Sequence, residues 1–365
     1  MASILYLFSR VNNCIFMHVN RKLCKKKITD KLKKVKEPKK LSKMQVREIQ
    51  SFYKNIIGRE VSLYGHKYFY SRTGVFSKEY IPSDLYFCDI LPRANNQKLN
   101  AAYTDKNICD IWFADARQPK TVLKNMNGYF YIDGQQVTKE DATRRCSDIQ
   151  DVIIKPSLSS KGKGVQCISA KDGIVSSLNI SVAQLFDEYG DNFIVQERLK
   201  QHADMSALNP TSVNTLRILS FHSGMDVLIV YSVIRIGRLG AVIDNQSSGG
   251  ISATIDKEGR IGKYAFGSVG DERIEKTDTG IVLDGFQVPS YDKAIEMVKR
   301  LHKKLPYFDI LGWDIAIDEF GEPVLIEYNI RPGLSQSAFC SGMGENTERI
   351  LRELWPKRNT MLRVE

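Results

Sequence analysis

The chain has 365 residues, 42% of them hydrophobic, so it can bury a substantial core and we expect an ordinary globular protein of two or three lobes. Its five histidines and seven cysteines are scattered without a C-x-x-C motif, which argues against a zinc site or a disulfide framework. An odd cysteine count fits a reducing cytoplasm. The apolar runs near the N-terminus are too short for a membrane span or a signal peptide, so we expect a cytoplasmic protein.

The formal net charge of +11 comes from one segment. Thirteen lysines and arginines lie between residues 21 and 47 against only Asp30 and Glu37, so the rest of the chain is balanced. We expect residues 1–40 to form a solvated or poorly ordered basic arm, and docking of this arm to an anionic lipid surface or to nucleic acid is the alternative. We expect no nucleic-acid partner, and peripheral membrane contact through the arm stays open.

The next segment is expected to be helical and irregular. Residues 41–56 place apolar side chains at helical spacing, and Ser42 with Gln45 fits a capping box at the start of this helix. The aromatic-rich stretch 60–92 lacks clean periodicity, so we expect helix and loop whose aromatic rings belong to the core.

From Val152 onward the pattern changes to short β-rich runs. They include VIIK, VQCIS, FIVQE, TLRILSF, VLIVYSVIRIG, WDIAI and VLIEYN. Helical segments near residues 139–147, 181–189 and 290–304 lie among them. The fold class is therefore α+β with largely antiparallel sheets.

The last two β runs, WDIAI and VLIEYN, each contain a carboxylate. The intervening DEFGEP predicts a hairpin turn, which places Asp314 opposite Glu327, with Asn329 on the same face. Facing carboxylates destabilise a sheet unless a cation lies between them, and oxygen ligands suit Mg²⁺ or Mn²⁺. The alternative is an exposed hairpin whose acids are merely solvated.

The stretch VIIKPSLSSKGKGV predicts a strand that ends at Lys155, followed by a loop of small residues. Backbone N–H groups of such a loop can surround phosphate oxygens, although an ordinary hairpin turn would have the same composition. Arg217 and Arg238 lie where anions would need a cation, and each is expected to meet either a transferring phosphoryl group or an ordinary ion-pair partner.

Taken in this order, these pieces resemble the ATP-grasp superfamily, whose members activate a carboxylate as an acyl phosphate. The resemblance implies two α+β lobes with antiparallel sheets that sandwich ATP. It assigns nucleotide contacts to Lys106, Lys155, Ser159, Ser160, Lys161, Gly162, Gly164, Gln196, Glu197 and Leu199. It assigns catalysis to Arg217, Arg238, Asn245 and Arg331, and the magnesium-binding hairpin to Asp314, Glu327 and Asn329.

Residues 40–345 further resemble the sugar-transfer-associated ATP-grasp family of bacterial surface-polysaccharide genes. The basic arm (1–40) lies outside this resemblance. After it we expect a helical or irregular region (41–103), a nucleotide-binding lobe (104–200), a catalytic, metal-binding lobe (201–345) and a tail (346–365).

We therefore expect an ATP-dependent carboxylate–amine ligase that uses ATP with Mg²⁺ or Mn²⁺. Its substrates would be a small or sugar-linked acid and an amine, joined as an amide of an amino acid and a sugar acid in polysaccharide synthesis, such as a capsule. Two alternatives remain: a kinase of the same fold that phosphorylates a sugar or polyol, and a non-catalytic protein that binds anionic surfaces or nucleic acid.

Overall fold

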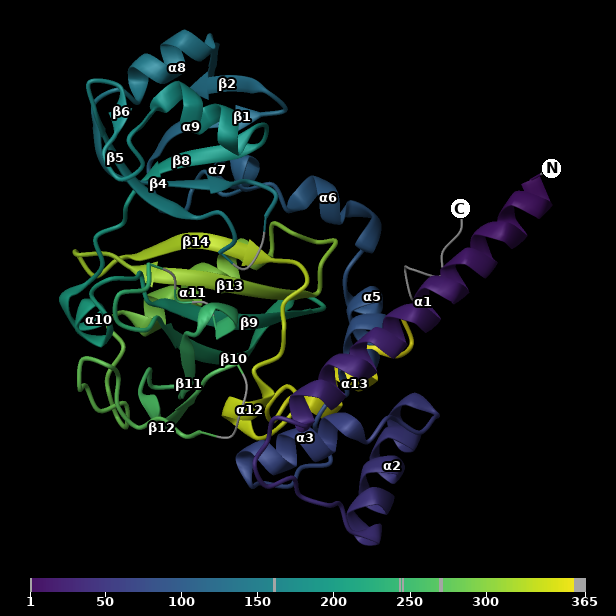
Figure 1. The fold of residues 1–365 in the computed structure, drawn as a ribbon. Helices are drawn as coiled ribbons and strands as arrows, with labels where there is room; N and C mark the ends of the chain where they lie inside the picture. The colour runs from purple at the N-terminus through teal and green to yellow at the C-terminus, as the bar shows by residue number, and fades with distance from the viewer. Residues whose placement is uncertain (1, 160–161, 243, 245, 269–271, 358–365) are drawn as a thin grey trace.

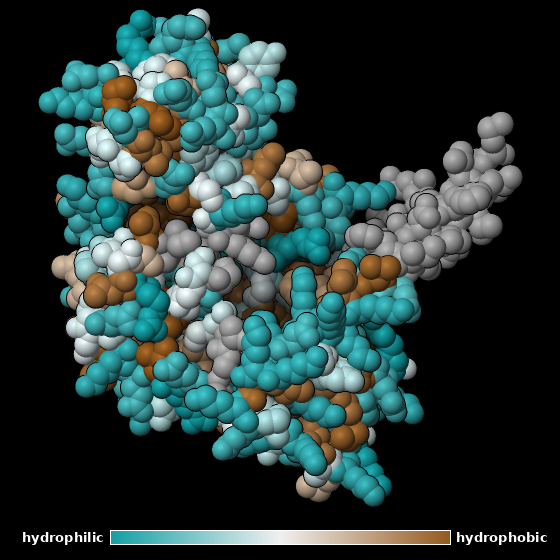
Figure 2. Space-filling view, viewed as in Figure 1, coloured by the Kyte–Doolittle hydropathy of each residue, from teal (hydrophilic) through white to brown (hydrophobic). Residues whose placement is uncertain are grey.

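The computed structural model describes residues 2–159, 162–242, 244, 246–268 and 272–357, with the side chains of 2–16 and 247 outside the description. Two antiparallel sheets lie one above the other, and a helical N-terminal region lies beside the lower sheet (Figure 1). The α+β class with antiparallel sheets is thus confirmed. The surface seen in Figure 2 is mostly hydrophilic over both layers.

The upper sheet has the strand order β3-β2-β1-β8-β4-β5-β6-β7. Its strands are β1 (Thr121–Met126), β2 (Tyr129–Ile132), β3 (Gln135–Val137), β4 (Ile149–Pro156), β5 (Gln166–Lys171), β6 (Ile174–Val175), β7 (Ile180–Ser181) and β8 (Phe193–Glu197). Helices α8 (Lys139–Arg145) and α9 (Val182–Tyr189) pack on it, burying Leu185 and Phe186 against strand residues such as Val195. This leaves the other face of the sheet toward the lower layer (Figure 1).

The lower sheet has the strand order β12-β11-β10-β9-β13-β14. Its strands are β9 (Thr215–Ser223), β10 (Asp226–Ile236), β11 (Ile251–Ile255), β12 (Ile261–Phe266), β13 (Ile310–Ile317) and β14 (Pro323–Asn329). Helix α11 (Tyr291–His302) covers one face and buries Val298 and Leu301 with Leu216 and Ile218 of β9. Helix α10 (Ala203–Leu208) and the 3₁₀ turn η4 (Gln246–Ser248) complete this layer.

The opposite face of β9 changes character along its length. Thr215, Arg217, Leu219 and Phe221 alternate onto this face. Leu219 and Phe221 join a core that includes buried residues of the N-terminal helices, whereas Thr215 and Arg217 lie at the polar end of the strand. The polar half of this face is where the predicted site residues gather.

The N-terminal region is helical, as expected. It contains α1 (Ala2–Leu32), α2 (Lys43–Ile57), α3 (Tyr64–Thr73), α4 (Ser83–Leu85), the π-helical turn η1 (Tyr86–Ile90), α5 (Leu91–Ala94), η2 (Gln97–Leu99) and α6 (Asn100–Tyr103). The turn η3 (Lys106–Ile108), which contacts β1 and β8 of the upper sheet, and α7 (Cys109–Trp112) follow it. The Ser42–Gln45 capping box of α2 is confirmed, and Gly58 ends the helix with a φ of 74°. The aromatic side chains Tyr68 and Tyr80 are buried, also as expected.

The basic arm differs from the expected solvated or poorly ordered segment. Helix α1 contacts α3 and α4, and Ile28 and Val35 are buried in one cluster with Tyr68, Phe69 and Tyr80. Arg21 adds an ion pair of 2.8 Å with Asp89. The expectation failed because the lysines mask an apolar stripe at helical spacing, Ile28, Leu32 and Val35. Across the described residues, no helix is both long and apolar enough to span a bilayer.

The segment predicted as a C-terminal tail also begins with a packed helix. Helix α13 (Thr347–Leu354) contacts α2, and Ile350, Leu351 and Leu354 are buried in the core beneath the N-terminal helices. The short helix α12 (Gln336–Phe339) lies between β14 and α13 in the chain.

Candidate active site

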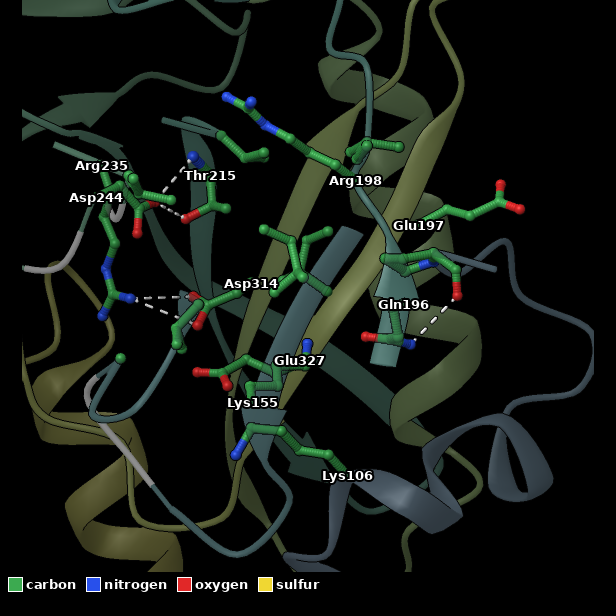
Figure 3. Close-up of a pocket in the computed structure, with 18 of the residues that line it drawn as sticks. Lys106, Lys155, Gln196, Glu197, Arg198, Thr215, Arg235, Asp244, Asp314 and Glu327 are labelled. Atoms are coloured by element: carbon green, nitrogen blue, oxygen red, sulfur yellow. Dashed lines mark hydrogen bonds and ion pairs between the residues drawn. The ribbon is translucent and has the colours of Figure 1, made fainter. Parts of the chain in front are cut away.

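A cleft lies between the two sheets, and we call it the first cleft. Residues of both layers line it, and Figure 3 shows their side chains gathered around one space. The predicted residues that line it are Lys106, Lys155, Ser159, Gly162, Gln196, Glu197, Leu199, Asp314 and Glu327. Side chains from segments more than 200 residues apart in the chain thus meet at this point.

The hairpin of β13 and β14 has the predicted register. Asp314 pairs with Glu327 across the two strands, and Asp314 also pairs with Arg217 on β9. A bulge follows Asp314, so the pairing shifts by one residue toward the turn. The Nδ2 atom of Asn329 lies 3.4 Å from Oδ2 of Asp314 and 3.4 Å from Oε1 of Glu327. Two carboxylates and one amide therefore share one side of the hairpin, as predicted.

The two carboxylates have opposite electrostatic environments. Burial raises the pKa of Glu327, and the neighbouring Asp314 raises it further. Burial also acts to raise the pKa of Asp314, but the ion pairs with Arg217 and Arg235 outweigh it and lower this pKa to about 2. Glu327 is thus the group for which a bound cation would relieve the greater electrostatic cost.

Arg217 is directed at Asp314. Its Nε and Nη2 atoms donate to Oδ1 and Oδ2 of Asp314 at 2.6 Å each, and both side chains are buried. Arg217 was predicted to meet either a phosphoryl group or an ion-pair partner, and in this structure the partner is a carboxylate of the β13–β14 hairpin. A bidentate guanidinium–carboxylate pair of this kind fixes the orientation of Asp314.

Two lysines enter the cleft from the upper lobe. Nζ of Lys106 donates to the carbonyl oxygens of Ser157, at 3.3 Å, and Ser159, which ties it to the glycine loop. Burial lowers the pKa of Lys155, while the nearby Glu327 acts in the opposite direction. Figure 3 shows Lys106 and Lys155 on the same side of the cleft as Glu327.

The glycine loop joins β4 to β5. Gly162 and Gly164 have φ values of 70° and 74°, which favour glycine. A Cβ at Gly164 would lie 2.9 Å from Cγ of Pro156, so the loop also needs glycine for space. Gly162 and Val165 line the first cleft, whereas Gly164 between them does not. Ser160 and Lys161, also predicted to contact the nucleotide, lie outside the described residues.

The remainder of the cleft forms an apolar slot between the sheets. Ile153 and Val165 line it from the upper layer, and Val213 and Ile326 from the lower layer. Such walls suit a flat heteroaromatic ring. The carboxylate of Glu197 points away from this slot (Figure 3) and pairs with Lys120 at 2.9 Å, so side-chain recognition by Glu197 is not supported.

None of the three described residues predicted to be catalytic lines the first cleft, since Arg217 and Arg331 line an adjoining cleft and Arg238 lines neither. Arg238 is paired with Asp278 at 2.7 Å and lines neither this cleft nor its neighbour, so the prediction that it is catalytic is not supported by its position. Asn245 lies outside the described residues. Asn329 and Arg331 line an adjoining second cleft, which also reaches Glu327.

Three charged residues of the first cleft were not predicted from the sequence: Arg198, Arg235 and Asp244. Nη1 of Arg235 lies 3.4 Å from both oxygens of Asp314. Burial raises the pKa of Asp244 to about 6, and its carboxylate accepts hydrogen bonds from the backbone N–H and the hydroxyl of Thr215. A lone arginine in the apolar run VLIVYSVIRIG was the available signal for Arg235.

A family model described as sugar-transfer associated ATP-grasp matches residues 89–350. The chain belongs to the sugar-transfer-associated ATP-grasp family. A search of curated protein sequences found no match.

Solved structures similar to this ATP-grasp chain show low identity. The biotin carboxylase domain of 2-oxoglutarate carboxylase from Hydrogenobacter thermophilus, in complex with MgADP, ADP and bicarbonate, is 10% identical (TM-score 0.44), over 73% of this chain and 48% of that one. The ATP-grasp ligase PsnB is 13% identical (TM-score 0.39), over 71% and 62%. The L-amino acid ligase from Bacillus licheniformis is 10% identical (TM-score 0.38), over 69% and 48%. The chain thus spans about half to three fifths of these proteins.

The donor set in this ATP-grasp chain fits a magnesium nucleotide. Two carboxylates and an amide offer hard oxygen ligands, and the raised pKa of Glu327 marks a position that a cation would stabilise. Lys106 and Lys155 add positive charge on the same side, where phosphates would complete the shell of the metal. Asp314, Glu327 and Asn329 are the residues that would hold the ion.

Proposed function

We propose that this protein is an ATP-dependent carboxylate–amine ligase. The observation that supports it best is the Asp314–Glu327 pair, which opens into an interlobe cleft that also holds Lys106 and Lys155. This arrangement offers a metal site, cations for phosphates and an apolar slot for a base.

In the proposed reaction, the γ-phosphoryl group passes from ATP to a carboxylate oxygen and ADP leaves. The amine nitrogen then forms a bond with the acyl carbon as inorganic phosphate leaves, and the nitrogen loses a proton. Mg²⁺ held by Asp314, Glu327 and Asn329 would neutralise charge on the β- and γ-phosphates. Lys106 and Lys155 would bind phosphate oxygens, and Arg235 would stabilise charge on the transferring group.

Arg217 would act through Asp314. Because its two hydrogen bonds hold the carboxylate in one orientation, Arg217 is a positioning residue in this proposal. The chain needs no side-chain nucleophile for this chemistry, since the substrate carboxylate attacks the phosphorus atom itself.

Trapping with hydroxylamine tests the proposal. Purified protein is supplied with ATP, Mg²⁺ and a panel of sugar acids, without an amine, and the products are assayed for ADP and for a hydroxamate. A ligase gives both, because hydroxylamine captures the acyl phosphate. A sugar kinase gives ADP and a phosphate ester without hydroxamate, and this result would overturn the ligase proposal.

The matched variants are Glu327→Gln and Glu322→Gln, two glutamates of the same hairpin. Glu322 is paired with Lys293 at 2.7 Å, away from the cleft. We expect Glu327→Gln to lower ADP release by about a hundred-fold or more. Thermal unfolding should show that Glu327→Gln remains folded, because it removes a carboxylate that burial destabilises. Equal activities of the two variants would contradict the proposed metal site.

A further inference from the structure

A second cleft adjoins the first along the polar face of the lower sheet. Arg235 and Glu327 line both clefts, so the second cleft begins where the proposed phosphoryl transfer would take place. Its outer wall comes from the N-terminal region, with Ile28 of α1, Tyr68 of α3 and Phe87 of η1. A ligand in this cleft would therefore touch both the catalytic hairpin and the N-terminal helices.

The described residues of this second cleft are strongly cationic. Its basic lining residues are Lys31, Arg72, Arg217, Arg235 and Arg331, and its one acidic lining residue among those described is Glu327. Asp314 pairs with Arg217 and also lies 3.4 Å from Arg235, and the five basic residues of the lining still outnumber the two carboxylates, Asp314 and Glu327, among the described residues. The cleft favours an anionic occupant.

Arg72 is the most informative of these cations. Its residue is only 6% exposed, yet its hydrogen bonds go to neutral groups: the hydroxyl of Tyr68 at 2.8 Å and the carbonyls of Gly267 and Ser268. Its Nε atom is buried without a hydrogen-bond partner. Arg217, at a similar depth, has a bidentate carboxylate. Among the described residues, no carboxylate pairs with this guanidinium. A buried guanidinium without a counter-ion is costly, and an anion bound in the cleft would supply one.

Aromatic rings form the other part of this wall. Tyr68, Phe69 and Phe266 line the cleft, and the guanidinium of Arg72 lies 5.9 Å from the centroid of Tyr68 and 5.5 Å from that of Phe266. These rings are nearly buried, with exposed fractions of 1% for Tyr68, 8% for Phe69 and 6% for Phe266, so they give the cleft an apolar border around Arg72. Anion recognition at Arg72 and an apolar border for the carbon skeleton of a ligand thus occur at the same wall.

We propose that the second cleft binds the carboxylate substrate, and that this substrate is a sugar acid with a second anionic group that pairs with Arg72. This inference rests on the proposed ligase function. The reacting carboxylate lies at the Arg235 and Glu327 end, and the second anion, a phosphate or a carboxylate, lies at the Arg72 end. The amine would then approach the acyl phosphate from the open side.

Binding measured without ATP tests the inference. Calorimetry compares three probes on the full chain: glucuronic acid with one anionic group, and glucaric acid and glucuronic acid 1-phosphate, each with two. We expect at least one doubly anionic probe to bind roughly ten-fold or more tightly than glucuronic acid, as a charge-assisted hydrogen-bonded pair provides. Comparison of glucaric acid with glucuronic acid 1-phosphate shows whether the second anion is a carboxylate or a phosphate. Equal affinities for all three probes would overturn the inference.

Variants locate the second anion. Arg72→Gln should abolish the preference for the doubly anionic probe, and Arg72→Lys should retain part of it. The control Arg352→Gln, at an exposed position of α13, should leave the preference intact. A preference that survives in folded Arg72→Gln would also overturn the inference. Since the wild-type comparison needs no variant, a folding failure of Arg72→Gln leaves the test in force.

The two proposals fail differently. Tight binding of a doubly anionic probe without ADP release or hydroxamate from any acid would keep the inference about the ligand and overturn the ligase function. Hydroxamate formation from singly anionic acids, with equal binding of the three probes, would keep the ligase function and overturn the inference about the ligand.

Discussion

Arg217 and Asp314 form a buried bidentate ion pair between neighbouring strands, with both hydrogen bonds at 2.6 Å. The pair joins the central strand β9 to the proposed metal hairpin. It therefore links the stability of the lower sheet to the geometry of the site.

Replacing Arg217 with methionine should destabilise the protein. Among the described residues, the substitution leaves the buried Asp314 with the longer contacts to Arg235 and Asn329, each at 3.4 Å, so we expect a loss of about 3 kcal/mol in the free energy of unfolding. Urea denaturation measures this loss. The double variant Arg217→Met/Asp314→Leu should recover much of it, because the buried guanidinium and the buried carboxylate are then removed together. Simple additivity of the two single variants would contradict the ion-pair explanation.

Asp244 should make stability depend on pH. Its folded pKa of about 6 lies above the ordinary value of 3.8, so the folded state binds the proton more tightly than the unfolded state does. The resulting stabilisation is present below about pH 4 and is lost as the pH rises to about 6. Compared with Asp244→Asn, the wild type should lose on the order of 2 to 3 kcal/mol between pH 4 and pH 7.

Urea denaturation at several pH values measures the difference between these two proteins. The exposed Asp226, the first residue of β10, offers the control substitution Asp226→Asn. If the difference between wild type and Asp244→Asn stays constant across this range, the stated environment of Asp244 is wrong.

Alanine substitutions at Gly164 and Gly173 distinguish the effect of backbone strain from the effect of steric crowding. Their φ values are 74° and 76°, but only at Gly164 would a Cβ meet another residue, Pro156 at 2.9 Å. Alanine at either position should cost about 1 to 2 kcal/mol of stability. Only Gly164→Ala should also weaken ATP binding, because it displaces the loop that follows Lys155. Calorimetric titration with ATP and Mg²⁺ measures this, and equal affinities of the two variants would count against the loop as a phosphate site.

Helix α1 offers a test of the N-terminal wall. Ile28 is buried against α3, whereas Lys26 in the same helix is exposed. We expect Ile28→Ser to cost about 2 kcal/mol or more and to raise the KM for the acid, while the affinity for ATP is unchanged. Lys26→Ser should alter neither. A change in ATP affinity in Ile28→Ser would show that α1 supports the whole site and not the second cleft alone.

The hairpin could be predicted because two strong local signals agree. Alternation in WDIAI and VLIEYN sets the faces, and the Gly-Pro turn sets the register, which brings Asp314 opposite Glu327. The capping box at Ser42 was equally local. Both depend on residues that are close in the sequence.

The missed features depend on distant partners. Arg235 reaches Asp314 only because β9 lies between their strands, and a bulge near Val230 shifts the register of β10. Ile28 is an unremarkable residue among lysines until Tyr68, Phe69 and Tyr80 form the surface beneath it. Neither relationship is contained in the local pattern of either segment.

The shared wall of the two clefts has an energetic consequence. Arg235 and Glu327 border both spaces, so the charge that one ligand brings alters the field that the other meets. Occupancy of one cleft must then change affinity in the other by a factor that is the same in both directions. A magnesium nucleotide and an anionic acid would accordingly bind as a thermodynamically coupled pair, and the sign of that coupling would reveal whether the ion screens the two anions from each other.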